Sequence, residues 1–169
     1  LTQNTYSQNW SEFANTNRYD KANLELKLHT KAENRVVFMG NSITEGWVLM
    51  RPEFFQDRDY INRGIGGQTT PQMLLRFRPD VIDLNPKIVV ILAGTNDIAG
   101  NTGYTSLETI IDNIKSMAEI ANANSIKVII SSILPAIEYL WKPGLEPSSK
   151  IISINKALKV YAKENNFIY

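Results

Sequence analysis

Ser42 is the first residue in the sequence whose surroundings suggest chemistry. Residues 40–47 read Gly-Asn-Ser-Ile-Thr-Glu-Gly-Trp and lie between an apolar run and a predicted helix. A serine hydroxyl at this place could act as a nucleophile, and the free N–H groups of a helix N-terminus could stabilise developing negative charge. The spacing from Ser42 to Glu45 is equally typical of a capping box, in which the serine only caps the helix. The first loop by itself leaves both interpretations open.

Two further loops contain a glycine-rich turn and an amide. Residues 62–70 read Asn-Arg-Gly-Ile-Gly-Gly-Gln-Thr-Thr, and the glycines would let the main chain approach a ligand closely. A tight turn before a helix that begins at Thr70 is the alternative interpretation. Residues 93–98 read Ala-Gly-Thr-Asn-Asp-Ile, in which Asn96 could donate hydrogen bonds to an oxyanion or form an Asx turn. Neither loop is specific when it is considered alone.

Alternating strands and helices are predicted to position the three loops. Continuous runs of β-branched and apolar residues indicate parallel strands that are covered on both faces. These strands are predicted over residues 35–39, 59–62, 87–92, 127–131 and 167–169. Helices are predicted over 19–28, from a cap at Thr70, from a capping box of Thr105 and Glu108, and over 148–165. This order predicts a three-layer α/β/α fold with a flavodoxin-like sheet of about five parallel strands, and a ligand site beyond their carboxyl ends.

Composition and charge exclude several classes of function. The 169 residues have a net charge of +1 and scattered basic residues, which argues against a nucleic-acid partner. The sequence has no cysteine for thiolate chemistry, and its one histidine, His29, excludes a multi-histidine metal site, so we expect no cofactor or metal. No run approaches the roughly 20 apolar residues of a transmembrane helix. The polar start without methionine predicts a secreted or periplasmic protein whose signal peptide has been removed.

Together the three loops resemble the sequence blocks of the SGNH (GDSL-like) family of serine ester hydrolases. Residues 40–44 resemble its Gly-Asp-Ser-Leu block, residues 66–69 its glycine-supplying second block, and residues 94–97 its Gly-x-Asn-Asp block. The blocks occur in the family's order, each at the end of a predicted strand. The Gly-Ile-Gly-Gly-x-Thr stretch at residues 64–69 is most similar to the branch that contains platelet-activating-factor acetylhydrolase-like and carbohydrate esterases.

The resemblance implies catalytic roles for three residues. Ser42 would attack an ester carbonyl, and its own N–H, the Gly67 N–H and the Asn96 side-chain amide would hold the oxyanion. Asp97 is expected to brace its loop. The implied partner is a small-molecule or glycan ester, with a short acyl group such as acetyl on carbohydrate or lipid.

Other interpretations of the same loops remain open. The first is a non-catalytic module on the same fold that binds an ester or a glycan without turnover. A flavodoxin-like nucleotide binder is disfavoured, because Glu45 and Trp47 follow the first strand where a phosphate-binding loop would be needed. Residues 134–141, after the fourth strand, contain aromatic side chains that either line the substrate pocket or simply pack within their loop.

Two departures from the family pattern affect the expected activity. Asn41 stands where the family usually has aspartate, and the Asp-x-x-His block expected near the C-terminus is absent from the 169 residues. His29 precedes the first strand and is expected to be a surface residue. We expect residues 1–34 to form a polar segment and a helix, and residues 35–169 to form a hydrolase domain truncated at its C-terminus. The natural protein is expected to continue beyond Tyr169 with the missing block, and the 169-residue chain alone to be almost inactive.

Overall fold

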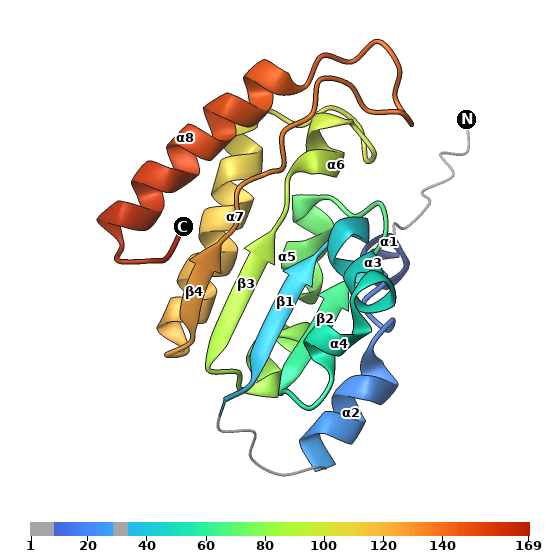
Figure 1. The fold of residues 1–169 in the computed structure, drawn as a ribbon, viewed down its shortest axis with the longest axis vertical. Coiled ribbons are helices and arrows are strands. Elements are labelled where there is room, and N and C mark those ends of the chain that lie inside the picture. The colour runs from blue at the N-terminus through green and yellow to red at the C-terminus, as the bar shows by residue number, and fades with distance from the viewer. Residues whose placement is uncertain (1–8, 29–33) are drawn as a thin grey trace, which may run out of the picture.

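In the part of the chain that the computed structural model describes, residues 9–28 and 34–169, a parallel sheet has the strand order β2-β1-β3-β4 (Figure 1). Its strands are β1 (Val36–Gly40), β2 (Tyr60–Gly64), β3 (Ile88–Leu92) and β4 (Lys127–Ile130). The predicted fifth strand is reduced to one parallel bridge between Ile168 and Ile129. The next residue, Tyr169, lies against α8, where its hydroxyl donates to the Asn155 main-chain oxygen at 3.0 Å. The described sheet therefore has four strands rather than five.

Helices flank the sheet on both faces, which confirms the predicted three-layer α/β/α architecture. The helices are α1 (Trp10–Ala14), α2 (Asp20–Leu28), α3 (Ser42–Met50), α4 (Pro52–Phe55), α5 (Thr70–Asp80), α6 (Thr95–Ile98), α7 (Leu107–Ala123) and α8 (Ser148–Glu164), with a 3₁₀ turn at Ile82–Leu84. Figure 1 shows α3 and α4 in front of β1 and β2, and α5 and α7 behind the sheet. Among these described helices, each is too short or too polar to cross a membrane.

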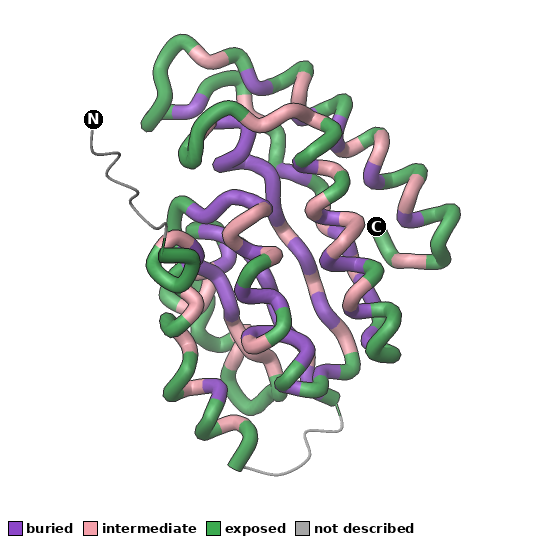
Figure 2. Tube along the Cα trace, turned by 180° about the vertical axis from the view of Figure 1, so that it is seen from behind, coloured by how far each residue is buried: buried purple, intermediate pink, exposed green. Residues whose placement is uncertain are grey.

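The two faces of the sheet are covered unequally. Val37, Val89 and Val128 lie in one register row and are buried in the core that α5 and α7 complete. Figure 2, which views the molecule from the opposite side to Figure 1, shows buried positions concentrated in the strands and on the inward sides of the helices. In the next row, Phe38 packs edge-on against aromatic side chains of α3 and α4, whereas Val90 stays only half-buried. The face that carries α3 is thus well covered over β1 and less covered over β3.

Two helix starts differ from prediction by one residue. α5 is capped by Thr69 rather than Thr70, and the Gln72 side chain accepts a hydrogen bond from the Thr69 N–H at 2.9 Å. α7 is capped by Ser106 rather than Thr105, with the Ser106 hydroxyl accepting from the Thr109 N–H at 3.1 Å. Both errors have one cause, since two adjacent hydroxyl residues precede each helix and either can cap it. At α5 the Thr70 hydroxyl donates to the Asp97 carboxylate at 2.6 Å, and Thr69 caps the helix.

Candidate active site

The register of the sheet brings the three predicted loops to one edge. Gly40, the last residue of β1, pairs with Gly64 at the end of β2 and with Leu92 at the end of β3. The three loops that follow these residues therefore start at the same level, at the carboxyl ends of neighbouring strands. This is the edge at which open α/β sheets bind ligands.

Ser42 is the first residue of α3 and is exposed. The helix is capped by Asn41, whose side-chain oxygen accepts a hydrogen bond from the Ile43 N–H at 3.0 Å. Because Asn41 is the cap, Glu45 is not at the capping-box position, and its carboxylate instead accepts a hydrogen bond from the Gly66 N–H at 2.9 Å. Among the described residues, none forms a hydrogen bond with the Ser42 hydroxyl. The capping interpretation of Ser42 is therefore wrong, and Asn41 performs that role.

The glycine loop lies directly beside Ser42. A Cβ atom placed on Gly66 would lie 3.9 Å from the Ser42 Cβ and 3.0 Å from the Glu45 carboxylate. Gly67 has a φ of +74°, in the left-handed region that glycine adopts without strain. Its carbonyl accepts a hydrogen bond from the Asn101 side chain at 3.1 Å. Both glycines are exposed, so main-chain atoms are accessible next to the serine.

Asn96 connects the third loop to the second. Its side chain is only 4% exposed, and its Nδ2 atom donates a hydrogen bond to the main-chain oxygen of Gln68 at 2.9 Å. Gln68 directly follows Gly67, so the amide is fixed one residue from the glycine. Because Nδ2 carries two hydrogens, this bond orients the amide and leaves its second N–H for another acceptor.

Asp97 braces the loop against helix α5. Its buried carboxylate accepts hydrogen bonds from the Thr70 N–H at 2.9 Å and from the Thr70 hydroxyl at 2.6 Å. Asn113 of α7 donates to the same hydroxyl at 3.0 Å, which adds a third helix to the contact. Burial raises the pKa of Asp97, while the hydrogen bonds from Thr70 lower it. These contacts match the bracing role that was expected for this residue.

A buried arginine that the sequence analysis missed ties the strand ends together. Arg76 of α5 is fully buried, and its guanidinium donates to the main-chain oxygens of Gly40 at 3.1 Å and Arg63 at 3.0 Å. It also donates to the Asp80 carboxylate at 2.8 Å and to the Gln68 side chain at 2.5 Å. Burial lowers the pKa of the Arg76 guanidinium, and Asp80 opposes that change.

A signal for this arginine was present in the sequence. Arg76 and Asp80 continue the spacing of Met73 and Phe77, which form the buried stripe of α5. An ion pair placed on an apolar stripe indicates a buried polar contact rather than a solvated face.

Two other features were predicted from the sequence, His29 and the aromatic loop after β4. His29 falls within residues 29–33, which the structure does not describe. In the loop after β4, Tyr139 is buried and stacks on Trp141 at 4.7 Å, whereas Leu140 is exposed. Tyr139 also belongs to the hydrophobic core, and this packing accounts for its burial. Beside it, an apolar groove of about 420 Å³ is lined by Pro135, Ala136, Ile137, Ser148, Ile151 and Ile152.

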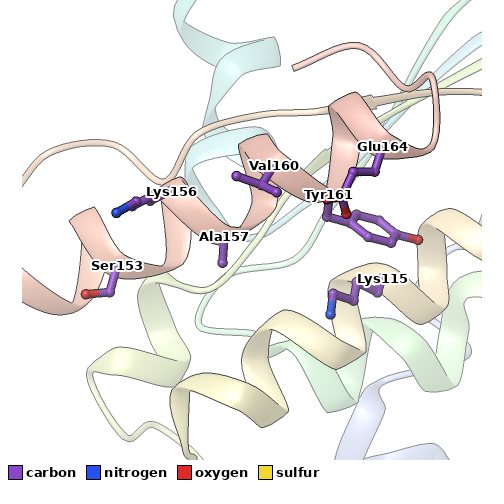
Figure 3. Close-up of a pocket in the computed structure, with 7 residues that line it drawn as sticks. All are labelled: Lys115, Ser153, Lys156, Ala157, Val160, Tyr161 and Glu164. Atoms are coloured by element: carbon purple, nitrogen blue, oxygen red, sulfur yellow. The ribbon is translucent and has the colours of Figure 1, made fainter.

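A separate hollow lies between α7 and α8 (Figure 3). It has a volume of about 500 Å³, and Lys115 lies over the Tyr161 ring at 5.4 Å. The Tyr161 hydroxyl donates to Glu119 at 3.1 Å, and burial together with this carboxylate raises the pKa of Tyr161 to about 12. None of the three loops contributes to this hollow, so it is not the candidate active site. Across residues 9–28 and 34–169, no group of three metal-binding side chains occurs.

Comparison with known proteins identifies the family. Residues 38–169 match the GDSL-like Lipase/Acylhydrolase family. The crystal structure of a GDSL-like lipase from Bacteroides thetaiotaomicron is 53% identical, with a TM-score of 0.89 over 92% of this chain and 77% of that one. An acetylxylan esterase from Geobacillus stearothermophilus shares the fold, with 20% identity and a TM-score of 0.66 over 79% of this chain and 74% of that one.

Two curated relatives are longer than the regions they share with this chain. Platelet-activating factor acetylhydrolase IB subunit alpha2 of Homo sapiens is 30% identical over 136 residues, which is 76% of this chain and 54% of the relative. The lipoprotein YqeF of Bacillus subtilis is 40% identical over 83 residues, or 47% of this chain and 34% of the relative. The chain thus spans at most about half the length of these two proteins. Since the family match covers most of its residues, the chain belongs to the GDSL-like lipase/acylhydrolase family.

Proposed function

We propose that the protein hydrolyses carboxylic esters with short acyl groups, with Ser42 as the nucleophile. One observation carries the proposal: Ser42 is exposed at the start of α3, is relieved of capping by Asn41, and lies beside the accessible main chain of Gly66 and Gly67. Membership of an acylhydrolase family supports the same reaction.

The reaction begins when the Ser42 Oγ attacks the carbonyl carbon of the ester. The serine proton passes to a general base, and the carbonyl oxygen becomes an oxyanion. The N–H groups of Ser42 and Gly67 and the free N–H of the Asn96 amide then donate hydrogen bonds to it. Collapse of this intermediate breaks the bond to the alcohol, which leaves with the proton. Water then releases the acid from the acyl-serine and restores the hydroxyl.

The reaction needs a general base, and the described residues include no histidine that could serve as one. His29 is the one histidine of the 169 residues, and it lies outside the described ranges. We propose that the base is a histidine of an Asp-x-x-His block beyond these residues, as the family resemblance implies. The 169-residue chain alone should then keep only residual catalysis, about 10³–10⁴ over the rate in water.

Acetyl esters of carbohydrate or lipid are the proposed substrates. The named activity of the human relative, an acetylhydrolase with 30% identity, supports a short acyl group. The alternative is a binding module that holds an ester at the same loops without turnover. This alternative is favoured only by the lack of a described base.

The test uses the full-length protein, which carries the proposed Asp-x-x-His block. It compares the wild type with Ser42→Ala on an aryl acetate, with calorimetric titration of a non-hydrolysable ester analogue. Ser153→Ala is the matched control, since Ser153 is a hydroxyl on α8 outside the three loops. The proposal requires that Ser42→Ala loses the turnover above background while Ser153→Ala keeps it. Equal rates in all three proteins, with the analogue still bound, would support the binding module. Turnover in the ordinary enzyme range of about 1–10³ s⁻¹ that disappears in His29→Ala would instead identify His29 as the base.

A further inference from the structure

We propose that the N-terminal segment, residues 9–28, is a positioning element of the active site, and that it acts on the glycine loop through Gln68. The segment lies outside the region that matches the family, which begins at residue 38. This inference rests on the proposed function, because the loop needs a fixed shape only if its N–H groups serve the Ser42 reaction.

Gln68 joins three parts of the protein. Its side-chain Nε2 donates to the main-chain oxygen of Ala14, at the end of α1, at 2.6 Å. Its Oε1 accepts from the buried Arg76 guanidinium at 2.5 Å. Its main-chain oxygen accepts the Asn96 amide at 2.9 Å. Since Gln68 is buried and follows Gly67, a shift of its side chain would move both proposed oxyanion donors.

The segment also holds the other end of the glycine loop. Asn23 of α2 is buried, and its side-chain oxygen accepts hydrogen bonds from Arg63 at 2.9 and 2.7 Å. The Tyr19 ring faces the same guanidinium at 4.6 Å, and the Tyr19 hydroxyl donates to the Gly64 oxygen. Asn23 donates in turn to Asp80 at 2.8 Å, the carboxylate that pairs with the buried arginine of α5. Residues 63 and 64 are thus fixed from Tyr19 and α2, just as Gln68 is fixed from α1.

The loop between these two anchors needs such support. Gly64, Gly66 and Gly67 occupy three of four consecutive positions, and glycine has more main-chain freedom than any other residue. Oxyanion donors are effective only when they are held in place before the reaction. A contact between Arg18 and Glu45 at 3.5 Å adds little, because both side chains are partly exposed. The buried contacts of Gln68 and Asn23 therefore account for the fixed position.

The test uses two glutamines that both bind the N-terminal segment. Gln72 donates to the Phe13 oxygen at 2.7 Å, as Gln68 does to Ala14, but Gln72 lies on α5 outside the glycine loop. Gln68→Met and Gln72→Met each remove one hydrogen bond to the segment. Each also removes one acceptor on the other side, which serves the Arg76 guanidinium in the case of Gln68 and the Thr69 N–H in the case of Gln72. The readouts are the NMR order parameters of the Gly66 and Gly67 amides, and kcat and KM of the full-length protein for an aryl acetate.

We expect both order parameters to fall in Gln68→Met from the rigid range of about 0.85 towards about 0.6. In Gln72→Met we expect them to stay unchanged. The kcat of Gln68→Met should fall about 10- to 100-fold with little change in KM, because a displacement of about 1 Å has effects of this size. Equal effects of the two substitutions, or unchanged order parameters in Gln68→Met, would overturn the proposal.

A second pair of variants covers the case in which Gln68→Met does not fold. Tyr19→Phe keeps the ring over Arg63 and removes only the hydroxyl that binds Gly64. Tyr161→Phe removes a hydroxyl that binds Glu119, away from the loop. Lower order parameters in Tyr19→Phe alone would support the positioning role. If the loop loosens while the full-length wild type and its Ser42→Ala variant are equally inactive, the esterase assignment fails and the structural link stands. If the wild type turns over the ester and the order parameters are unchanged in Gln68→Met and Tyr19→Phe, the positioning proposal fails and the esterase assignment stands.

Discussion

Asn96 and Gln68 are joined by a hydrogen bond of 2.9 Å from the asparagine Nδ2 to the glutamine main-chain oxygen. This contact connects the loops after β3 and β2. Asn96→Ala should therefore lower kcat by about 10²- to 10³-fold, as loss of an oxyanion donor does elsewhere, with a smaller change in KM. Steady-state kinetics of the full-length protein on an aryl acetate measure both constants. Asn124→Ala, at the C-terminal end of α7, is the control. A change confined to the KM of Asn96→Ala would show that the amide binds the ground state only.

Gly64 is a position where a methyl group should be costly. A Cβ atom there would lie 2.1 Å from the Glu45 main-chain nitrogen and 2.7 Å from the Asn41 oxygen, and backbone atoms cannot rotate away. Gly64→Ala should lower the free energy of unfolding by about 1–3 kcal/mol, and should reduce turnover because α3 carries Ser42. Gly46→Ala meets nothing within 4 Å and should instead stabilise the helix by about 0.5–1 kcal/mol. Urea unfolding measures both. A loss of stability no greater in Gly64→Ala than in Gly46→Ala would contradict the close packing.

The stability of the protein should depend on the titration of Asp97. Burial raises the pKa of this carboxyl group in the folded state. A raised pKa favours the folded state fully below the unfolded pKa of about 4, and this contribution is lost as the pH rises through the folded pKa. Asp97→Asn remains neutral throughout. Wild type should therefore lose stability relative to Asp97→Asn as the pH rises from below about 4 through the raised pKa of the folded state. Urea titrations at several pH values test this. A constant difference, or a wild type that gains relative stability, would show that the pKa is not raised.

Alanine substitutions of two isoleucines on α8 distinguish the effect of side-chain burial from that of helix propensity. Ile154 is 0% exposed and belongs to the core, whereas Ile152 is 67% exposed. Ile154→Ala should lower the free energy of unfolding by about 2–5 kcal/mol, and Ile152→Ala should change it by no more than about 0.5 kcal/mol. Thermal and urea unfolding of both variants provide the measurement. Comparable losses would mean that α8 packs with a different face towards the sheet.

The framework could be predicted from the sequence where local pattern and tertiary structure agree. β3 and β4 are continuous β-branched runs, and α8 repeats apolar residues at helical spacing. The position of Ser42 at the end of β1 followed from the same patterns. The extent of each strand depends in addition on pairing with a neighbouring strand, which the local sequence does not show. The fifth strand needed a partner along its length, and only Ile168 finds one.

The supports of the candidate site could not be predicted because they are long-range polar contacts. Gln68 resembles any polar loop residue until Ala14 and Arg76 are brought to it from distant elements. The capping role of Ser42 was a reasonable local expectation, yet Asn41 competes for the same N–H groups and prevails. When a polar side chain has several possible hydrogen-bond partners, the one it binds can be identified only once the whole fold is known.

The pairing of Gly40 with Gly64 and Leu92 also affects how the site forms during folding. Strands that are distant in sequence must meet before the three loops share an edge, and such non-local contacts form slowly. During synthesis from the N-terminus, Ser42 leaves the ribosome long before Asn96 has been made. A nascent chain that has reached only β2 therefore carries the serine without the amide, and the proposed hydrolytic chemistry waits until β3 has joined the sheet.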